Sequence, residues 1–249
     1  MRKGHRPSQA PANRPRFWGR HPVTAALANP ERTVRRMWVT RETAQSLGGL
    51  AGVSFPVTFA EVADLGRLVP QDAPHQGVVI EVDPLEDVWL GDLLEQGAGN
   101  QRPLLVLDQV TDPHNVGAIL RSAAAFDALG IVTQDRHSPP ESGALARSAS
   151  GAVEIVPWVR VVNLARAMDE IGEAGFWRIG LASTAPRTLA EAIGGARVAL
   201  VLGAEGEGMR HNTAQHCDEL AKLPISPRME SLNVSNAAAI ALYAVAARG

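Results

Sequence analysis

The sequence predicts an α/β fold built on a mostly parallel sheet with helices on both of its faces. The first observation is a series of near-continuous apolar runs after Pro103, at 104–110, 129–132, 153–156, 178–181, 198–202 and 220–225. The second is that helix-like stretches separate most of these runs, at 117–126, 143–148, 164–174 and 189–193. Strands that are apolar throughout and alternate with helices are typical of a parallel sheet covered on both sides.

Length and composition are those of an ordinary folded protein with one large or two modest domains. The chain has 249 residues, of which 45% are hydrophobic and 20% are charged. A single cysteine, Cys217, excludes an intrachain disulfide and a cysteine-based metal cage, and it fits a reducing compartment. No apolar run approaches the roughly 18 residues of a membrane span, and no signal peptide is visible. We therefore expect a cytoplasmic protein.

The net charge of −2 conceals a basic N-terminal segment. Before Met37 a single acidic residue, Glu31, stands against a larger basic set: Arg2, Lys3, Arg6, Arg14, Arg16, Arg20, Arg32, Arg35 and Arg36. Such a segment is an electrostatic handle for phosphate groups, and its proline-rich first part favours disorder. We expect residues 1–15 to be a disordered basic arm, although a solubilising tail has the same composition.

The rest of the chain divides into a small domain, a linker and a larger domain. Residues 16–83 carry one helical and two extended patterns, as expected for a small α/β domain: 22–28, 37–40 and 77–82. Asp83-Pro84 and a stretch rich in Gly and Pro before Leu104 mark a linker over 84–102. The predicted parallel sheet belongs to the larger domain, 103–249.

Ligands of parallel sheets bind in the loops that follow the strands, and three such loops carry unusual residues. After the first apolar run, Asn115 and Gly117 precede Arg121, which lies in an otherwise apolar helical stretch. An arginine in such surroundings requires an anion, either a phosphate or a carboxylate. A solvated arginine at the edge of the helix is the alternative explanation.

The second loop is rich in glycine and reads Gly203-Ala204-Glu205-Gly206-Glu207-Gly208-Met209. It matches neither the phosphate-cradling Walker pattern nor the dinucleotide fingerprint, which argues against a conventional nucleotide-binding enzyme. Its two glutamates would repel a polyphosphate. A neutral or cationic ligand, or one recognised through adenine and ribose, suits the loop better, although a purely structural turn would also contain these glycines.

The third loop ends in a polar cluster at the start of an alanine-rich helical stretch: Glu230, Ser231, Asn233, Ser235 and Asn236. Ser and Asn are typical of helix starts, where their oxygens accept otherwise unpaired backbone N–H groups. Capping a helix needs one such residue, so the surplus indicates a function. An over-capped core helix is the plainer interpretation.

Together these stretches resemble the SpoU (TrmH-like) RNA ribose 2′-O-methyltransferases. The resemblance covers about 103–248 and rests on three ordered motifs: Asn115-x-Gly117-x-x-x-Arg121, Leu202-Gly203-Ala204-Glu205-Gly206-x-Gly208, and Leu223-Pro224 followed by Ser231-Leu232-Asn233-Val234-Ser235. The N-terminal part, from Trp18-Gly19-Arg20-His21 to His75-Gln76-Gly77, resembles the small L30e-like RNA-binding domain. That domain precedes the catalytic one in the subgroup that methylates a guanosine of 23S ribosomal RNA.

The resemblance implies a deep trefoil knot in the C-terminal domain, a homodimer and S-adenosylmethionine as the methyl donor, with no metal. It assigns the cofactor to Gly203, Leu223, Ile225 and Leu232, mostly through backbone groups. The family usually has Ile-Pro-Met followed by glycine in the third motif, whereas this chain has Leu223-Pro224-Ile225-Ser226. Contacts made by the backbone should survive that difference.

The resemblance also implies five catalytic residues: Asn115, Arg121, Glu205, Asn233 and Ser235. The family proposal makes Arg121 the base, but an arginine normally stays protonated because its pKa exceeds about 12. We therefore expect Arg121 to anchor the target phosphate and to stabilise the developing alkoxide. Asn115 and Glu205 would orient it, and Asn233 and Ser235 would hold the ribose or the catalytic loop.

Two rival functions share most of these features. A tRNA ribose 2′-O-methyltransferase would have every catalytic residue and differ only in its substrate. A non-catalytic RNA-binding protein would keep the knot and the basic arm without turnover. The presence of Arg121, Glu205 and Asn233 argues against this second possibility.

Overall fold

The computed structural model describes residues 14–50, 52–195 and 197–248, which fall into two compact units. The N-terminal unit comprises the described residues up to 85 together with 141–143, and the C-terminal unit comprises 86–140 and 144–248. Residues 1–13 of the predicted basic arm lie outside the described residues. Arg14, near the end of that arm, pairs with Asp83 at 2.7 Å.

The N-terminal unit contains a mixed four-stranded sheet in the order β1-β4-β2-β3. Its elements, in chain order, are β1 (Arg16–Trp18), α1 (Arg20–Ala28), β2 (Val34–Val39), α2 (Arg41–Ser46), β3 (Val57–Phe59), α3 (Val62–Gly66) and β4 (Val78–Val82). Strand β4 is antiparallel to both β1 and β2, whereas β2 and β3 are parallel. Strand β3 is an edge strand, so its last residue, Phe59, remains 54% exposed.

The C-terminal unit contains a seven-stranded sheet in the order β7-β6-β5-β10-β8-β11-β9. Its strands are β5 (Leu104–Asp108), β6 (Gly130–Gln134), β7 (Trp158–Val161), β8 (Phe176–Leu181), β9 (Arg187–Thr188), β10 (Arg197–Gly203) and β11 (Glu219–Lys222). Every pairing is parallel, which confirms the predicted sheet. The carboxyl ends of these strands therefore lie along one edge.

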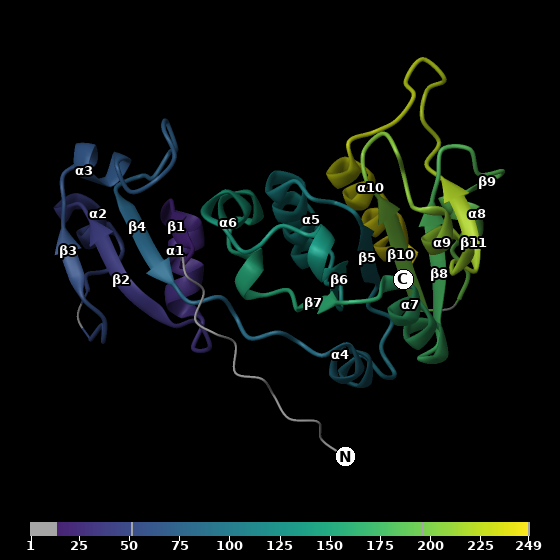
Figure 1. The fold of residues 1–249 in the computed structure, drawn as a ribbon, viewed down its shortest axis with the longest axis horizontal. Coiled ribbons are helices and arrows are strands. Elements are labelled where there is room, and N and C mark those ends of the chain that lie inside the picture. Colours follow the sequence, from purple (N-terminus) through teal and green to yellow (C-terminus); the bar gives the residue numbers. More distant parts are fainter. Residues whose placement is uncertain (1–13, 51, 196, 249) are drawn as a thin grey trace. The chain divides into compact units, whose positions relative to one another are not determined.

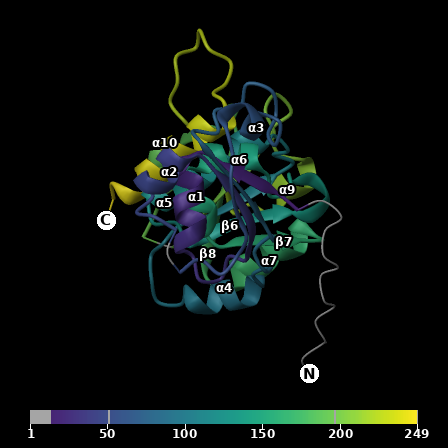
Figure 2. The same cartoon turned by 90° about the vertical axis from the view of Figure 1, so that its left-hand side faces the viewer.

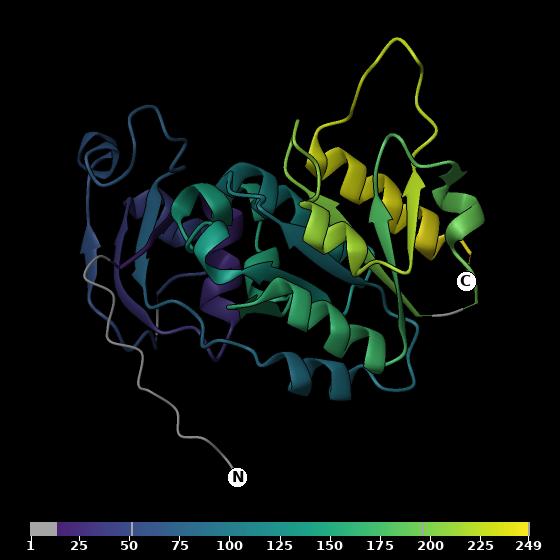
Figure 3. The same cartoon turned by 45° about the vertical axis from the view of Figure 1, so that its right-hand side comes forward.

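Helices cover both faces of this sheet, as predicted. Alternate residues of β5 belong to two different core clusters, with Leu105 and Leu107 on one face and Leu104 and Val106 on the other. The first face packs against α5 (Pro113–Ala125), α6 (Gly143–Ala149), α8 (Leu189–Ala192) and α10 (Val234–Ala246). The second packs against α4 (Leu90–Gln96) and α7 (Leu164–Glu173), and Figure 3 shows these helices on the side opposite α10. Short helices η1 (Asp135–His137), η2 (Ala152–Glu154) and α9 (His211–Gln215) complete the unit.

The predicted strand at 153–156 is wrong. The backbone there forms the turn of η2, in which Glu154 N donates to Gly151 O at 3.0 Å and Ile155 N to Ala152 O at 3.1 Å. These groups are bonded locally and cannot pair with a neighbouring strand, so the strand forms later, at β7. Val153 and Val156 are apolar because they pack into the core beside α5.

Two other boundaries also differ from the sequence-based expectation. The segment 84–102, predicted as a linker, contains α4, whose Leu90, Leu93 and Leu94 are buried in the C-terminal unit. The helix expected at 117–126 begins earlier, at Pro113, because Asp112 caps it by accepting a hydrogen bond from His114 N at 2.9 Å.

The segment 223–233 between β11 and α10 projects from the C-terminal unit as a long loop. Figure 1 and Figure 2 show it as the yellow-green excursion that precedes α10. Met229 within it is 61% exposed. This loop carries the third sequence motif to the edge of the sheet where the strands end.

Gly117 allows α5 and α6 to approach closely, and this contact is testable. A Cβ at Gly117 would lie 2.5 Å from Leu145 O and 2.7 Å from Ser148 Cβ. Gly117→Ala should therefore lower the free energy of unfolding by about 1–3 kcal/mol, although alanine is the better helix former. Urea unfolding followed by circular dichroism measures this change.

Gly91→Ala in α4 is the matched control, because its added Cβ would meet no heavy atom within 4 Å. That variant should be as stable as the wild type or slightly more stable. Equal stability of the two variants would contradict the close contact between α5 and α6.

Candidate functional site

A cavity of about 520 Å³ opens at the carboxyl edge of the C-terminal sheet. Its walls are the ends of β8, β10 and β11 and the loops that follow them, a position typical of ligand sites in parallel sheets. The volume suits a small organic ligand. All four residues predicted to bind the cofactor line it: Gly203, Leu223, Ile225 and Leu232.

Gly203 is required by the path of the loop that follows β10. A Cβ at this position would lie 2.0 Å from Gly208 C and 2.1 Å from Met209 N. Ala204 and Gly208 exchange two backbone hydrogen bonds, of 3.1 and 2.9 Å, so the loop folds back onto its own start. Gly203 is thus needed for the loop to fold back on itself. Because the loop packs so closely there, its backbone groups line the cavity wall.

Three residues from the three motifs meet in one hydrogen-bonded cluster, which we name the motif cluster: Asn115, Glu205 and Asn233. Glu205 Oε1 accepts from Asn115 Nδ2 at 3.0 Å and from Asn233 Nδ2. Asn233 Nδ2 also lies 3.0 Å from Asn115 Oδ1. Glu205 therefore ties the loop after β5 and the loop before α10 to the glycine-rich loop.

Asn233 has a second role as the cap of α10. Its Oδ1 accepts from Ser235 N at 2.9 Å and Asn236 N at 3.4 Å, and the Ser235 hydroxyl donates to the same oxygen. Of the five polar residues at this helix start, the one that caps α10 is also a predicted functional residue: its oxygen starts the helix and its amide nitrogen binds Glu205. Ser235 joins the cluster through Asn233.

Arg121 stands apart from the motif cluster. It is exposed on α5, and among residues 14–50, 52–195 and 197–248 it makes no hydrogen bond or ion pair. Asn115 and Glu205, which we expected to orient Arg121, bond to each other and to Asn233 instead. Four of the five predicted catalytic residues are therefore brought together, and the guanidinium of the fifth is available to an anion from outside the chain.

Sequence reasoning missed a buried ion pair beside this site. Asp108, at the end of β5, is fully buried and accepts from Arg210 Nε at 2.8 Å and Arg210 N at 2.9 Å. Arg210 also donates to Gln134 Oε1 at 2.8 Å. The pair fixes the far end of the glycine-rich loop to β5 and β6. A charged residue directly after four buried apolar residues was the available signal, because a buried carboxylate requires a partner.

Other chemistries find less support around the cavity. Burial raises the pKa of the Cys217 thiol to about 12, so at neutral pH this group is protonated and is a poor nucleophile. Within the described part of the chain, no three His, Cys, Asp or Glu side chains gather in a way that could hold a metal ion. None of the helices described is both long and apolar enough to span a bilayer.

Comparison with known proteins identifies the family. Residues 102–243 match the model of the SpoU rRNA Methylase family, more than half of the chain. The chain belongs to the SpoU rRNA methylase family. Residues 17–88 of this SpoU protein match a second model, described as RNA 2′-O ribose methyltransferase substrate binding.

The relatives of this SpoU protein are named as RNA methyltransferases. It is 37% identical over 239 residues to the 23S rRNA (guanosine-2′-O-)-methyltransferase RlmB of Pseudomonas aeruginosa, covering 92% of this chain and 95% of that protein. It is 36% identical to an uncharacterized tRNA/rRNA methyltransferase of Synechocystis, with 92% of this chain and 61% of that protein covered. The SpoU methyltransferase AviRb of Streptomyces viridochromogenes, solved with AdoMet, has the same fold, with a TM-score of 0.80, 23% identity and coverage of 94% of this chain and 89% of that one.

The ion pair between Asp108 and Arg210 should be essential to the stability of the C-terminal unit. Asp108→Asn removes the charge that Arg210 bonds and should cost about 1–3 kcal/mol of unfolding free energy. The cost stays below that of a fully buried pair because the Arg210 side chain is 38% exposed and remains partly hydrated. Urea unfolding measures the loss.

Asp127→Asn is the matched control, because Asp127 is 80% exposed in its pair with Arg102. Removing that exposed charge should change the unfolding free energy by less than about 1 kcal/mol. An Asp108→Asn protein as stable as the control would contradict an anchoring role for the buried pair.

Proposed function

We propose that this protein transfers a methyl group from S-adenosylmethionine to the ribose 2′-hydroxyl of a guanosine in 23S ribosomal RNA. Membership of the SpoU family and the likeness to RlmB over nearly its whole length support the reaction and the substrate. The observation that carries the proposal is the motif cluster, in which Asn115 and Asn233 bond to Glu205, a residue of the cavity wall.

The residues of the cavity fit S-adenosylmethionine. Gly203 brings backbone close to the ligand space, and Leu223, Ile225 and Leu232 supply apolar walls. Glu205, Glu207 and Glu230 also line the cavity, and their carboxylates favour a positively charged ligand over a polyphosphate. When bound, the cofactor would supply a methyl group that its positive sulfur already activates. The chain must then hold the ribose oxygen in line with that methyl group and assist the loss of the hydroxyl proton.

Arg121 is the proposed contact with the reacting nucleotide. Its guanidinium offers N–H donors in a planar fork that matches a phosphate, so we assign it to a phosphate of the RNA and to the charge that develops on the 2′-oxygen. Its exposure and its lack of a partner within the described ranges support that role. Asn115, Glu205, Asn233 and Ser235 are proposed to keep the catalytic loops in place around the ribose.

The proposal includes the arrangement of the whole protein. A basic arm, 1–15, precedes an L30e-like RNA-binding domain, 16–83. The segment 84–102, whose helix α4 packs into the C-terminal unit, connects that domain to the next. The methyltransferase domain, 103–249, contains a deep trefoil knot formed by the motif loops. Family membership and the bonds from Glu205 to residues in both flanking motifs support this arrangement. Action on ribosomal RNA implies a cytoplasmic location.

We further propose that the protein is a homodimer that packs through α10. Tyr243 and Ile240 on this helix are 62% and 45% exposed, and Phe126 lies edge-on to Tyr243 with ring centroids 6.2 Å apart. An apolar surface of this kind is typical of an interface. Ala238 and Ala241 are fully buried within the unit, so they serve its core and leave the outer face of α10 to a partner.

A tRNA ribose 2′-O-methyltransferase is the second candidate. The Synechocystis relative is named as a tRNA/rRNA methyltransferase, which favours keeping both substrates in view. A non-catalytic RNA-binding protein agrees less well with a chain that retains the complete motif cluster and an exposed Arg121.

Arg121 should be required for turnover and dispensable for cofactor binding. Arg121→Ala should lower kcat for methyl transfer to a 23S rRNA transcript by about 10²–10³-fold, because a donor to the developing charge is lost. Calorimetry should show nearly unchanged binding of S-adenosylmethionine. Arg121→Lys should also fail, since an ammonium cannot bind a phosphate with the planar two-point geometry of a guanidinium.

Arg166→Ala on α7 is the control, because Arg166 is 79% exposed and pairs only with Glu170 one helical turn away. It should retain wild-type turnover, and wild-type turnover by Arg121→Ala would disprove the role assigned to Arg121.

The wild type also decides between the candidate functions. Methyl transfer to tRNA alone would favour the tRNA methyltransferase, and transfer to neither RNA would favour the non-catalytic RNA-binding protein.

The dimer should dissociate when charge is placed on the outer face of α10. Tyr243→Glu should yield a monomer by light scattering at micromolar concentration, whereas the wild type should have twice the chain mass. Val162→Glu, at a position 83% exposed at the end of β7, controls for added charge and should remain dimeric. A wild-type monomer with full activity would contradict the proposed assembly.

A further inference from the structure

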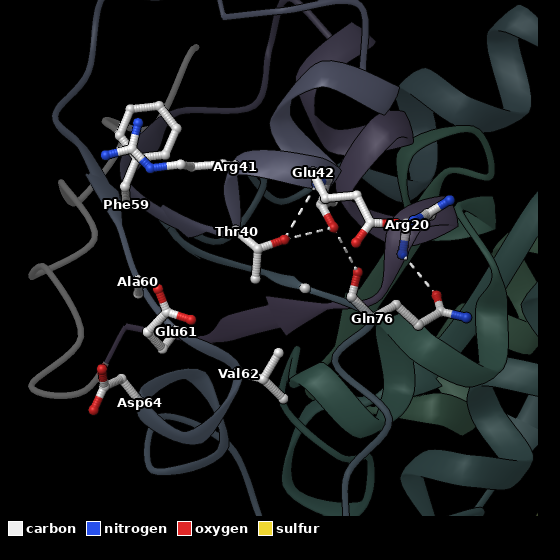
Figure 4. Close-up of a pocket in the computed structure, with 12 residues that line it drawn as sticks. Arg20, Thr40, Arg41, Glu42, Phe59, Ala60, Glu61, Val62, Asp64 and Gln76 are labelled. Atoms are coloured by element: carbon white, nitrogen blue, oxygen red, sulfur yellow. Dashed lines mark hydrogen bonds between the residues drawn. The ribbon is translucent and has the colours of Figure 1, made fainter.

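The N-terminal unit contains a second cavity, of about 750 Å³, that the proposed methyl transfer does not use. It lies between the start of α2, the end of β3 with the start of α3, and the turn before β4. Figure 4 shows its side chains, with Arg41 and Phe59 at one side and Arg20 and Gln76 at the other. Its volume is that of pockets that hold small organic groups.

One wall of the cavity is an exposed stacking surface. The Arg41 guanidinium lies over the Phe59 ring, 5.4 Å from its centroid, although Phe59 is 54% exposed. Aromatic rings are scarce in this chain, at 4% of residues, so an exposed one at a cavity is informative. Unstacked bases of RNA bind on aromatic rings and on arginine planes.

On the opposite wall, hydrogen bonds join the turn before β4 to the starts of α1 and α2. Thr43 Oγ1 donates to Gln76 O at 3.3 Å, and Arg20 N donates to Gln76 Oε1 at 2.9 Å. Thr40 Oγ1 caps α2 by accepting from Thr43 N at 3.2 Å. These bonds hold the turn before β4 against α2, so the cavity keeps its shape without a ligand.

A carboxylate that no described residue pairs with lies on the same side of the cavity as Phe59 (Figure 4). Glu61 occupies the position before α3, yet its side chain makes no capping bond, and no other residue that the structure describes pairs with it. Asp64 nearby is already paired with Arg67 at 2.7 Å. A carboxylate only accepts hydrogen bonds, so Glu61 selects a ligand that presents donors.

Among the RNA bases, guanine presents two adjacent N–H donors on its Watson–Crick edge, at N1 and at the N2 amino group. We infer that this cavity binds one unstacked guanine of the RNA, stacked on Arg41 and Phe59 and held at its Watson–Crick edge by Glu61. The free guanidinium of Arg20 at the rim is placed to meet the attached phosphate. The inference rests on the proposed function, because the guanine belongs to the RNA substrate.

The test measures binding of the full chain to two labelled hexanucleotides, UUUGUU and UUUAUU, by fluorescence anisotropy at one salt concentration. The wild type should bind the guanosine oligonucleotide at least about fivefold tighter, the discrimination of one good two-point contact. Glu61→Gln should bring the two affinities within about twofold of each other. Phe59→Ala should weaken both by about tenfold, and Phe59→Trp should restore them, because any aromatic ring stacks on any base.

Glu95→Gln on α4 is the control, since Glu95 is exposed in the C-terminal unit, and it should keep the preference. A wild-type ratio near one, or a preference that survives Glu61→Gln, would overturn the inference. Equal affinity for guanosine monophosphate and UUUGUU would do so too, by indicating a free-nucleotide site. Methyl transfer to the 23S rRNA transcript separates the two proposals. If the wild type methylates the transcript but shows no preference for UUUGUU, only the guanine site is wrong. If the wild type does not methylate the transcript, the proposed function is wrong and the guanine site is wrong with it.

Discussion

The Glu205 carboxylate joins three segments that are far apart in the chain. Its partners Asn115 and Asn233 are 90 and 28 residues away, and they bond to each other across 118 residues. An ionised acceptor suits this position because each amide offers N–H donors to it, and such charge-assisted bonds are stronger than neutral ones. Two walls of the cavity depend on this junction, since the loop before α10 and the glycine-rich loop meet there.

A second charged group fixes the same loop from its other end. Asp108 is buried at the end of β5, where an unpaired carboxylate would be costly, and Arg210 satisfies both of its oxygens. The glycine-rich loop is thus held at Glu205 and at Arg210. Between these anchors its own backbone bonds close a tight turn, which explains how a loop with three glycines keeps one conformation.

Much of this site could be predicted from the sequence because parallel strands end at one edge. Loops that follow different strands meet there regardless of their separation in the chain, so a ligand site could be expected at this edge. The assignment of Gly203, Leu223, Ile225 and Leu232 to that site came from the resemblance to the SpoU family, and all four line one cavity. Helix chemistry also predicted that one polar residue of the third motif would cap the helix that follows, and that residue is Asn233. The partner of Asp108 was not readable, because nothing local points to a residue 102 positions away. The turn of η2 was mistaken for a strand because a short apolar run has the same pattern in either structure.

The separation of these contacts has a consequence for how the site comes into being. During synthesis Asn115 emerges first, Glu205 much later and Asn233 later still, so their junction closes loops of 90 and 118 residues. Closing such loops carries an entropic cost that no local contact offsets, and folds rich in distant contacts form slowly. The strands β5, β6 and β7 can pair on the ribosome well before α10 exists. A nascent chain therefore passes through a stage with an ordered sheet and no competent site, and competence arrives only with its final helix.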